Sequence, residues 1–547
     1  MKRFTTLFMA VTACLPLLAQ TTPDDEVTFE VNQITYVVPD ISKNEIAITD
    51  CKATDKVIIP ETITYNEKEY TVKAIYEDAF YYSDATSIEL PNSIDSIGKH
   101  VFSSSKSLTS IKLPEKLKYL GRDAFSACSE LLSIELPETL TGIPENAFFT
   151  CYKLNSIKFP SKLEYIGNSA FYKAGMTSVE LPETCDSIGK SCFFLCPELK
   201  SIQLSSKTHF IGEGAFRGCA KLETFTIPEK IDSLDNNTLM DCSSLTSIHL
   251  PANLTKLGIC VFGGTGIKSY TVDEGNPSFQ VIDNVVYDKE KRLLYAFPQG
   301  KSEYTIPEGV IGIWGGAFYG TEISSVVLPE SMKALDESTF AFSQLSSINF
   351  PEALIYMGPT ALYDTQFTDI TLPKNMTLIY EGLLAYCKKL TSVTIPEKVT
   401  FIDTHAFFFD TNLTEVHCLG TTPPQVYEFY EEDESPFGYV DLSACKLYVP
   451  IGCKETYYEN GWDFFGKDNI IEETTGIETN ARESEWAVYE ENGTLRITVQ
   501  KPLLINIYDV TGNHIYEKLI SDTQNIPLPK GIYLVKGGGK VHKVAIK

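Results

Sequence analysis

Cysteine is the residue type whose number and spacing in this chain come closest to a chemical motif. Thiols at fixed spacing can form disulfides, bind zinc or act as nucleophiles. The sequence has 14 cysteines, and six of them lie fourteen residues after the residue, usually proline, that ends a recurring apolar run: Cys128, Cys151, Cys196, Cys219, Cys242 and Cys387. In other repeats this position holds Ser105, Ala174, Ser343 or Thr365. Such a position favours a small buried residue, so we predict buried thiols rather than disulfides or a metal site.

The other cysteines fit the same interpretation with one exception. Cys185 and Cys192 replace a leucine and an alanine of the recurring phrase, and we expect both to be buried. Cys445 and Cys453, near the end of the repeats, are the pair that best fits a disulfide. The sequence contains no CxxC pair and no zinc-type spacing.

No other set of residues resembles a catalytic centre. The seven histidines form no HExxH or paired zinc spacing, and GxSxG is absent. The segment GGTGIKS at 263–269 resembles a phosphate-binding loop but lacks the Gly-Lys-Ser/Thr ending. We therefore expect a protein that is not an enzyme and that needs no cofactor or metal.

Two polar rows are the candidate binding residues. Serine recurs four residues before the prolines, as at Ser110, Ser133 and Ser156. Charges of alternating sign lie two residues before them, at Glu89, Lys112, Glu135, Lys158 and Glu180. Because neighbouring strands lie about 4.8 Å apart, both rows should run side by side across a sheet. They either stabilise the sheet laterally or bind a partner, and the sequence leaves both interpretations open.

These positions belong to a phrase of about 23 residues that repeats along most of the chain. Clear copies are LTSIKLPEKLKYLGRDAFSAC (108–128) and LLSIELPETLTGIPENAFFTC (131–151). A fixed period of this length predicts a solenoid, in which each coil buries its apolar side against its neighbours. An extended interaction surface is more typical of this architecture than an enclosed enzyme pocket.

Each position of the phrase has a predicted structural role. The LxxIxL run predicts a short parallel strand, which the following proline ends because it has no N–H. A glycine after the next core aliphatic residue, as at Gly98 and Gly121, suggests a tight corner that can take a positive φ. Pro144 occupies this position in one coil, so the left-handed conformation is not required in every coil. The Ala-Phe phenylalanines, such as Phe125 and Phe148, are expected to stack as a buried spine.

In phase over residues 73–415, LxxIxLP, the Ile-Gly corner, Ala-Phe and the trailing Cys closely resemble the BspA-type leucine-rich repeats. The resemblance implies a right-handed, curved solenoid with its parallel sheet on the concave face. It also implies secreted or surface proteins of host-associated anaerobes, several of which are adhesins.

Composition and the N-terminus indicate an exported globular protein. With 43% hydrophobic residues and 12% aromatic residues, the chain is not disordered overall, and its net charge of −26 argues against nucleic acid as a partner. Lys2 and Arg3 precede an apolar run to Ala19, which predicts a signal peptide over residues 1–20. A lipobox-like VTAC makes lipid attachment at Cys14 the alternative. No other segment is long and apolar enough to cross a membrane.

The repeats divide the rest of the chain into predicted parts. We expect a β-rich cap over 21–72, a first array over 73–270, a hairpin insertion over 271–306 and a second array over 307–415. The segment 271–306 contains two apolar strands around 288–291, with either a structural role or a partner contact at the rim. A cap over 416–470 contains aromatic residues that either seal the last coil or offer a carbohydrate platform: Tyr457, Tyr458, Trp462, Phe464 and Phe465.

The C-terminal part differs in composition from the repeats. Residues 471–485 read as a polar linker, and 486–547 predict a small β-sandwich. INIYDVTGNHI and IPLPKGIYLVKGGGKVHKVAIK resemble the C-terminal sorting domain of type IX secretion, which implies outer-membrane export. We therefore expect a non-enzymatic surface adhesin or host-interaction protein that binds protein partners, for example in the host extracellular matrix. The alternative is a carbohydrate-binding or scaffold protein of the cell envelope.

Overall fold

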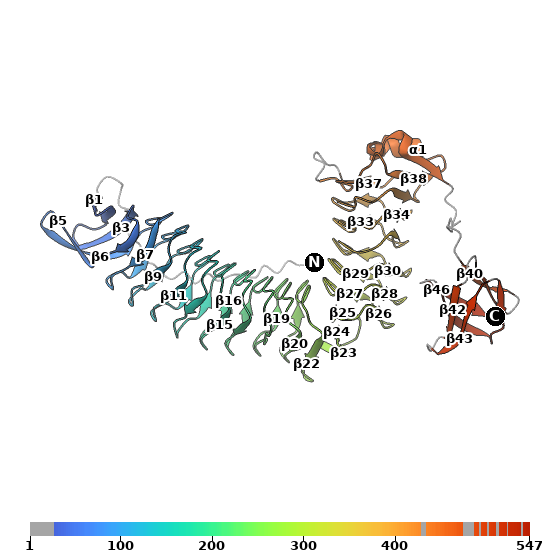
Figure 1. Cartoon of the computed structure of the whole chain (residues 1–547), viewed down its shortest axis with the longest axis horizontal. Coiled ribbons are helices and arrows are strands. Elements are labelled where there is room, and N and C mark those ends of the chain that lie inside the picture. The colour runs from blue at the N-terminus through green and yellow to red at the C-terminus, as the bar shows by residue number, and fades with distance from the viewer. Residues whose placement is uncertain are drawn as a thin grey trace. The chain divides into compact units, whose positions relative to one another are not determined.

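The structure is a computed structural model that describes residues 27–427, 434–473, 486–491, 494–499, 503–509, 513–521, 523–537 and 540–546. The predicted signal peptide with Cys14, and residues 474–485 of the predicted linker, lie outside the described residues. The chain forms two compact units, residues 1–472 and 473–547. The first unit is a β-solenoid of about 18 turns (Figure 1).

A β-rich cap begins the first unit. Its strands are β1 (Val27–Val31), β2 (Ile34–Val38), β3 (Glu45–Cys51), β4 (Asp55–Ile58), β5 (Thr62–Tyr65) and β6 (Lys68–Ile75). The antiparallel pair β1 and β2 covers the edge of β3, which pairs with β6 in the parallel manner of the repeats. The cap therefore closes the open end of the sheet, as an exposed parallel edge requires.

Each coil of the array has two strand sides and one turn side. The first sheet consists of the strands that precede the prolines: β7 (Ala85–Glu89), β9 (Ser110–Lys112), β11 (Ser133–Glu135), β13 (Ser156–Lys158), β15 (Ser178–Glu180), β17 (Ser201–Gln203) and β20 (Ser247–Leu250). The second sheet consists of two-residue strands before the glycine corner: β8 (Ser96–Ile97), β10 (Tyr119–Leu120), β12 (Gly142–Ile143), β14 (Tyr165–Ile166), β16 (Ser187–Ile188), β18 (Phe210–Ile211), β19 (Ser233–Leu234) and β21 (Lys256–Leu257). The pairs within both sheets are parallel, because each coil repeats the direction of the one before it.

The predicted phenylalanine spine runs through the first array. Phe125, Phe148 and Phe171 are fully buried, and their ring centroids lie 5.4 Å apart with interplanar angles of 2° and 4°. The stack continues to Phe102 at 5.0 Å and through Phe193. Offset stacking of rings at this distance is favourable beyond simple burial, which explains why the aromatic residue recurs at one phase.

The corner glycines do not have the positive φ that the sequence suggested. None of Gly98, Gly121 and Gly189 has a positive φ. A Cβ at Gly121 would instead lie 2.4 Å from the carbonyl carbon of Gly98, and one at Gly189 would lie 2.6 Å from the backbone of the preceding coil. The prediction of a left-handed corner is wrong, because glycine is needed here for the close approach of successive backbones.

Left-handed residues do occur, but on the turn side of the coil and mostly without glycine. Asp123 and Ala127 have φ of 57° and 59°, and the next coil repeats this at Asn146 and Thr150 with 55°. Asparagine and aspartate tolerate this conformation better than other side chains, which explains the first position. The second position, occupied by alanine and threonine, is held by cross-coil hydrogen bonds such as Ala127 N to Phe149 O at 2.7 Å.

The insertion contains two antiparallel turns rather than one. Its strands are β22 (Ser269–Val272), β23 (Phe279–Ile282), β24 (Val285–Asp288) and β25 (Leu293–Ala296). β24 pairs with β25 around the predicted turn, and with β23 around Asp283-Asn284, whose φ values of 52° and 64° fit a tight hairpin turn. On the turn side, the coil before the insertion bonds directly to the coil after it, through Cys260 N to Gly315 O at 3.0 Å.

The second array repeats the same pattern and ends in a cap. First-sheet strands are β26 (Glu303–Thr305), β28 (Ser325–Val327), β30 (Ser347–Ile348), β32 (Asp369–Thr371), β34 (Ser392–Ile395), β36 (Glu415–Cys418), β38 (Lys446–Pro450) and β39 (Ile470–Glu473). Second-sheet strands are β27 (Gly312–Ile313), β29 (Ala334–Leu335), β31 (Tyr356–Met357), β33 (Leu378–Ile379), β35 (Phe401–Ile402) and β37 (Gln425–Val426). The short helix α1 (Lys454–Tyr457) follows β38, and β39 extends three residues into the predicted linker.

The second unit has the small β-sandwich architecture that the sequence predicts. One sheet contains β40 (Trp486–Glu491), β41 (Thr494–Val499) and β44 (Gln524–Ile526). The other contains β42 (Leu503–Asp509), β43 (His514–Ile520), β45 (Gly531–Gly537) and β46 (Lys540–Ile546). Ile497 and Ile507, one from each sheet, lie fully buried in one apolar core.

Candidate binding face on the first array

The two predicted polar rows lie on neighbouring strands of the first sheet. Ser133 pairs with Ser156 and Glu135 with Lys158 in the register between β11 and β13, and Glu89 pairs with Lys112 between β7 and β9. Ser110, Lys112 and Glu180 are likewise exposed, whereas the alternate residues point into the core. The structure therefore brings all eight predicted residues onto one face, which we call the first-sheet face (Figure 1).

The charges on this face are only partly satisfied by each other. Glu135 and Lys158 form an ion pair, which raises the pKa of the Lys158 ammonium, and Glu89 accepts from Lys56 at 2.8 Å. Within the described chain, Lys112 and Glu180 take part in no ion pair at all. Ion pairs this exposed contribute little to stability.

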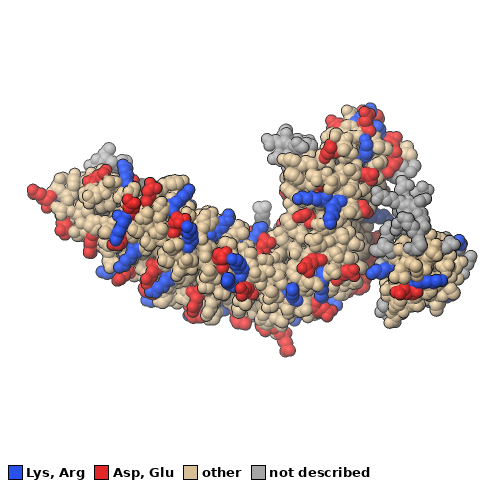
Figure 2. Space-filling view, in the orientation of Figure 1, with Lys and Arg blue, Asp and Glu red and all other residues tan. Residues whose placement is uncertain are grey.

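The charged row does not extend into the second array. The five equivalent positions hold Thr305, Val327, Asn349, Thr371 and Thr394, and Val327 is 49% exposed. Figure 2 shows Lys and Arg interspersed with Asp and Glu along the first array on the face in view. The charged row is therefore confined to the first array.

The small buried residues fourteen positions after the prolines also form hydrogen bonds between coils. The Cys128 thiol donates a hydrogen bond to Phe102 O at 3.0 Å, and Cys151 to Phe125 O at 3.1 Å, so each thiol binds the coil before its own. Ser105 donates to Phe80 O in the same way. Burial raises the pKa of Cys128 to about 12, which keeps the donor proton in place. Sequence reasoning found the burial but missed the hydrogen bond, although most residues seen at this position are donors.

In the last coil of the second array, this repeat position holds an aspartate. Asp410 lies fourteen residues after Pro396, is fully buried, and accepts a hydrogen bond from Cys387 N at 2.7 Å through Oδ1. Its other oxygen has no partner among the described residues. Burial raises the pKa of the Asp410 carboxyl well above its ordinary value, because the charged form is desolvated.

We expect Asp410→Asn to stabilise the protein at neutral pH. The stabilising contribution of the protonated carboxyl to the free energy of unfolding is fully present below the pKa that the group has in the unfolded chain. This contribution is lost as the pH rises through the higher pKa of the folded state. The amide has no proton to lose, so the variant should gain about 1–3 kcal/mol at pH 7.5 and little or nothing near pH 3. Urea unfolding of both proteins across this range measures the difference. A difference independent of pH would show that Asp410 does not titrate as argued.

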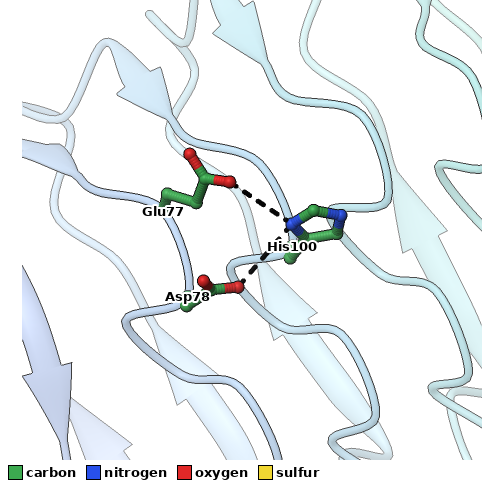
Figure 3. Close-up of side chains that lie close together, drawn as sticks. All are labelled: Glu77, Asp78 and His100. Atoms are coloured by element: carbon green, nitrogen blue, oxygen red, sulfur yellow. Dashed lines mark ion pairs between the residues drawn. The ribbon is translucent and has the colours of Figure 1, made fainter.

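A second cluster joins three neighbouring coils near the start of the array. His100 Nδ1 lies 3.6 Å from both Glu77 Oε1 and Asp78 Oδ1 (Figure 3), and Nε2 lies 3.4 Å from Asp123 Oδ2. Arg122 also binds Asp123, with Nε 3.0 Å from Oδ2. Glu77, Asp78 and His100 could each offer one ligand atom to a cation, but three carboxylates around an imidazole equally form an ordinary ion cluster. The sequence missed this grouping, because one coil separates Asp78 from His100.

Two predictions for the end of the array are resolved by burial. Cys445 and Cys453 are free and buried, so the predicted disulfide between them is wrong. Tyr457 and Trp462 are also fully buried, and donate to Gly420 O at 2.7 Å and Pro424 O at 2.9 Å. Phe465 is only 2% exposed. These three rings seal the last coil and are not available as a carbohydrate platform, whereas Tyr458 and Phe464 are half-buried and pack against the same core.

The coils, the two parallel sheets and the buried spine define a leucine-rich repeat protein. The family described as the BspA type leucine rich repeat region matches the chain in six copies, over residues 73–176, 165–293 and 302–430. The chain belongs to this family. No curated protein matches it, and among the described residues no helix has the length and apolar character to span a bilayer.

Several solved structures are similar to this chain over most of its length. A leucine rich cell surface protein from Faecalibacterium prausnitzii is similar over 81% of this chain and 99% of its own, at 22% identity and a TM-score of 0.45. The pneumococcal vaccine antigen PcpA is similar over 82% and 99%, at 21% identity and a TM-score of 0.43. A leucine-rich repeat protein from Bacteroides ovatus is similar over 77% and 99%, at 20% identity and a TM-score of 0.40.

Proposed function

We propose that this protein is a non-enzymatic, exported binding protein that acts as a bacterial surface adhesin. Its first-sheet face binds a protein partner, such as a host extracellular matrix or cell-surface protein. The observation that carries the proposal is the exposed double row of serines and alternating charges on β7 to β15, in which Lys112 and Glu180 form no ion pair within the described chain.

The dimensions of the face suit a protein. From β7 to β17 successive strands about 4.8 Å apart give a polar surface roughly 25 Å long, which is about the edge length of a patch of about 800 Å², one side of a standard protein interface. Alternating charge along such a surface favours a partner with the complementary alternation and disfavours a uniformly charged polymer. The predicted signal peptide and the resemblance of the tail to a type IX sorting domain support export to the cell surface.

Reversing the two lysines of the row tests the proposal. Lys112→Glu with Lys158→Glu would leave five consecutive acidic residues on the face, from Glu89 to Glu180. We expect at least tenfold weaker binding to a panel of immobilised extracellular matrix proteins, because the complementary charge is lost. The double variant should keep its melting temperature within a few degrees, since exposed cross-strand pairs contribute only tenths of a kcal/mol.

The matched control changes the same net charge elsewhere. Lys153 and Lys221 are exposed and pair with Glu130 and Glu198, each at 2.7 Å, outside the first-sheet face. Lys153→Glu with Lys221→Glu should bind like the wild type. Equal binding by both double variants, or equal loss in both, would contradict docking on the first-sheet face.

A further inference from the structure

The second sheet of the first array has an exposed row of its own. Successive coils place Tyr119, Gly142, Tyr165, Ser187 and Phe210 at its first strand position, so an aromatic residue alternates with a small one. The aromatic side chains are 39%, 47% and 37% exposed for Tyr119, Tyr165 and Phe210. This row lies on a different side of the coil from the first-sheet face and takes no part in the function proposed above.

The central ring reaches over the preceding coil. A Cβ placed on Gly142 would be 2.2 Å from both Cε1 and Cζ of Tyr165, so the ring covers the glycine of the preceding coil. Tyr165 is 47% exposed, so part of its side chain is open to solvent. Aromatic residues in alternate coils are about 10 Å apart along the array.

A shallow depression of about 400 Å³ lies beside this row. Its lining comes from four successive coils: Glu164, Thr184, Asp186, Lys207, His209 and Lys230. Glu164 and His209 immediately precede Tyr165 and Phe210 in the chain, which places the polar groups next to the aromatic row. The Thr184 hydroxyl already donates to Leu163 O at 2.7 Å.

The other polar side chains of the depression are unpaired. Elsewhere in these coils lysines and glutamates one repeat apart close into ion pairs, as Lys190 does with Glu213 at 2.7 Å. Within the described residues, no ion pair involves Glu164, Asp186 or His209, nor either lysine of the depression. Two carboxylates and two ammonium groups that could pair across coils instead remain available to a ligand.

We propose that this second-sheet surface binds an extended, uncharged β-1,4-linked glycan. The apolar face of a pyranose ring packs against an exposed aromatic face, and every second residue of such a chain presents the same face, in keeping with rings in every second coil. Sugar hydroxyls can donate to Glu164 and Asp186 and accept from Lys207 and Lys230. The two acidic and two basic groups balance, so the depression does not favour a polyanion.

Binding of β-1,4-linked hexasaccharides of glucose and of N-acetylglucosamine to the full chain tests the proposal by calorimetry. We expect the wild type to bind at least one of them, and Tyr165→Ala to weaken that binding roughly tenfold through loss of one stacking contact. Glu164→Gln should weaken it as well, because it removes a charged acceptor beside the ring while leaving the ring in place.

Tyr152→Ala is the matched control, because Tyr152 is 56% exposed but lies outside the aromatic row. It should bind the hexasaccharides like the wild type. Thermal melts of all variants should show that each of them is folded. Failure of the wild type to bind either hexasaccharide at millimolar concentration would overturn the proposal. Unchanged glycan binding by Tyr165→Ala would also overturn it. If no glycan binds and Tyr165→Ala instead loses binding to matrix proteins, the aromatic row binds a protein and the proposal is wrong.

Discussion

Phe148→Ala should lower the free energy of unfolding of the array by about 3–5 kcal/mol, since it removes a fully buried ring and leaves a cavity. The loss falls at the upper end for such changes, because Phe148 stacks on Phe125 and Phe171 at 5.4 Å on either side. A solenoid coil contacts only its neighbours, so the damage cannot be shared with distant parts of the chain.

Chemical denaturation of the wild type and the variant measures the effect. Phe148→Leu mimics Leu239, which takes the spine position in another coil, and should cost under about 1.5 kcal/mol. Tyr152→Ala removes an exposed ring from the same coil and should change stability by about 0.5 kcal/mol at most. A Phe148→Ala protein that unfolds like the Tyr152→Ala protein would show that the spine does not stabilise the array.

Trp462→Ala should destabilise the C-terminal end of the array by about 3–5 kcal/mol. Trp462 is fully buried, packs against Tyr457 at a centroid distance of 5.6 Å and donates to Pro424 O. Its loss leaves that carbonyl without the donor and opens the last core layer to water. Hydrogen exchange should accelerate first in β36 and β38, because opening starts at an uncapped end.

Two control variants show how much of the effect of Trp462→Ala comes from the buried ring. Trp462→Phe keeps a six-membered aromatic ring but loses the five-membered ring with its N–H donor, so it should cost about 1–3 kcal/mol, less than the change to alanine. Tyr427→Ala removes an aromatic side chain that is 39% exposed in the same region and should have little effect on stability. Uniform acceleration of exchange along the whole array, rather than at its end, would contradict a capping role for Trp462.

The sequence predicted the features that depend on a fixed period. The 23-residue spacing placed Phe148 in the spine and Cys151 in a small buried position, and both are fully buried. It also placed Ser133 and Glu135 on one exposed face. These predictions succeed because residues at the same phase of a solenoid have the same environment, so one coil describes its neighbours.

The features that the sequence did not predict depend on contacts between coils. The role of Gly121 follows from its distance to the coil before it, and the partners of His100 come from adjacent coils. The aromatic row on the second sheet needed the observation that the Tyr165 ring lies over Gly142. Such relations connect residues 22 or 23 positions apart, and single-sequence patterns of strand and turn do not contain them.

The ladder of thiols also makes the unfolding of individual coils directly observable. Cys128, Cys151, Cys196, Cys219 and Cys242 each bind a carbonyl of the coil before them and are fully buried. A thiol in this position can react with an alkylating reagent only after its coil has separated from that neighbour. The rate at which each cysteine is labelled therefore reports where along the molecule local opening begins, without any probe being introduced.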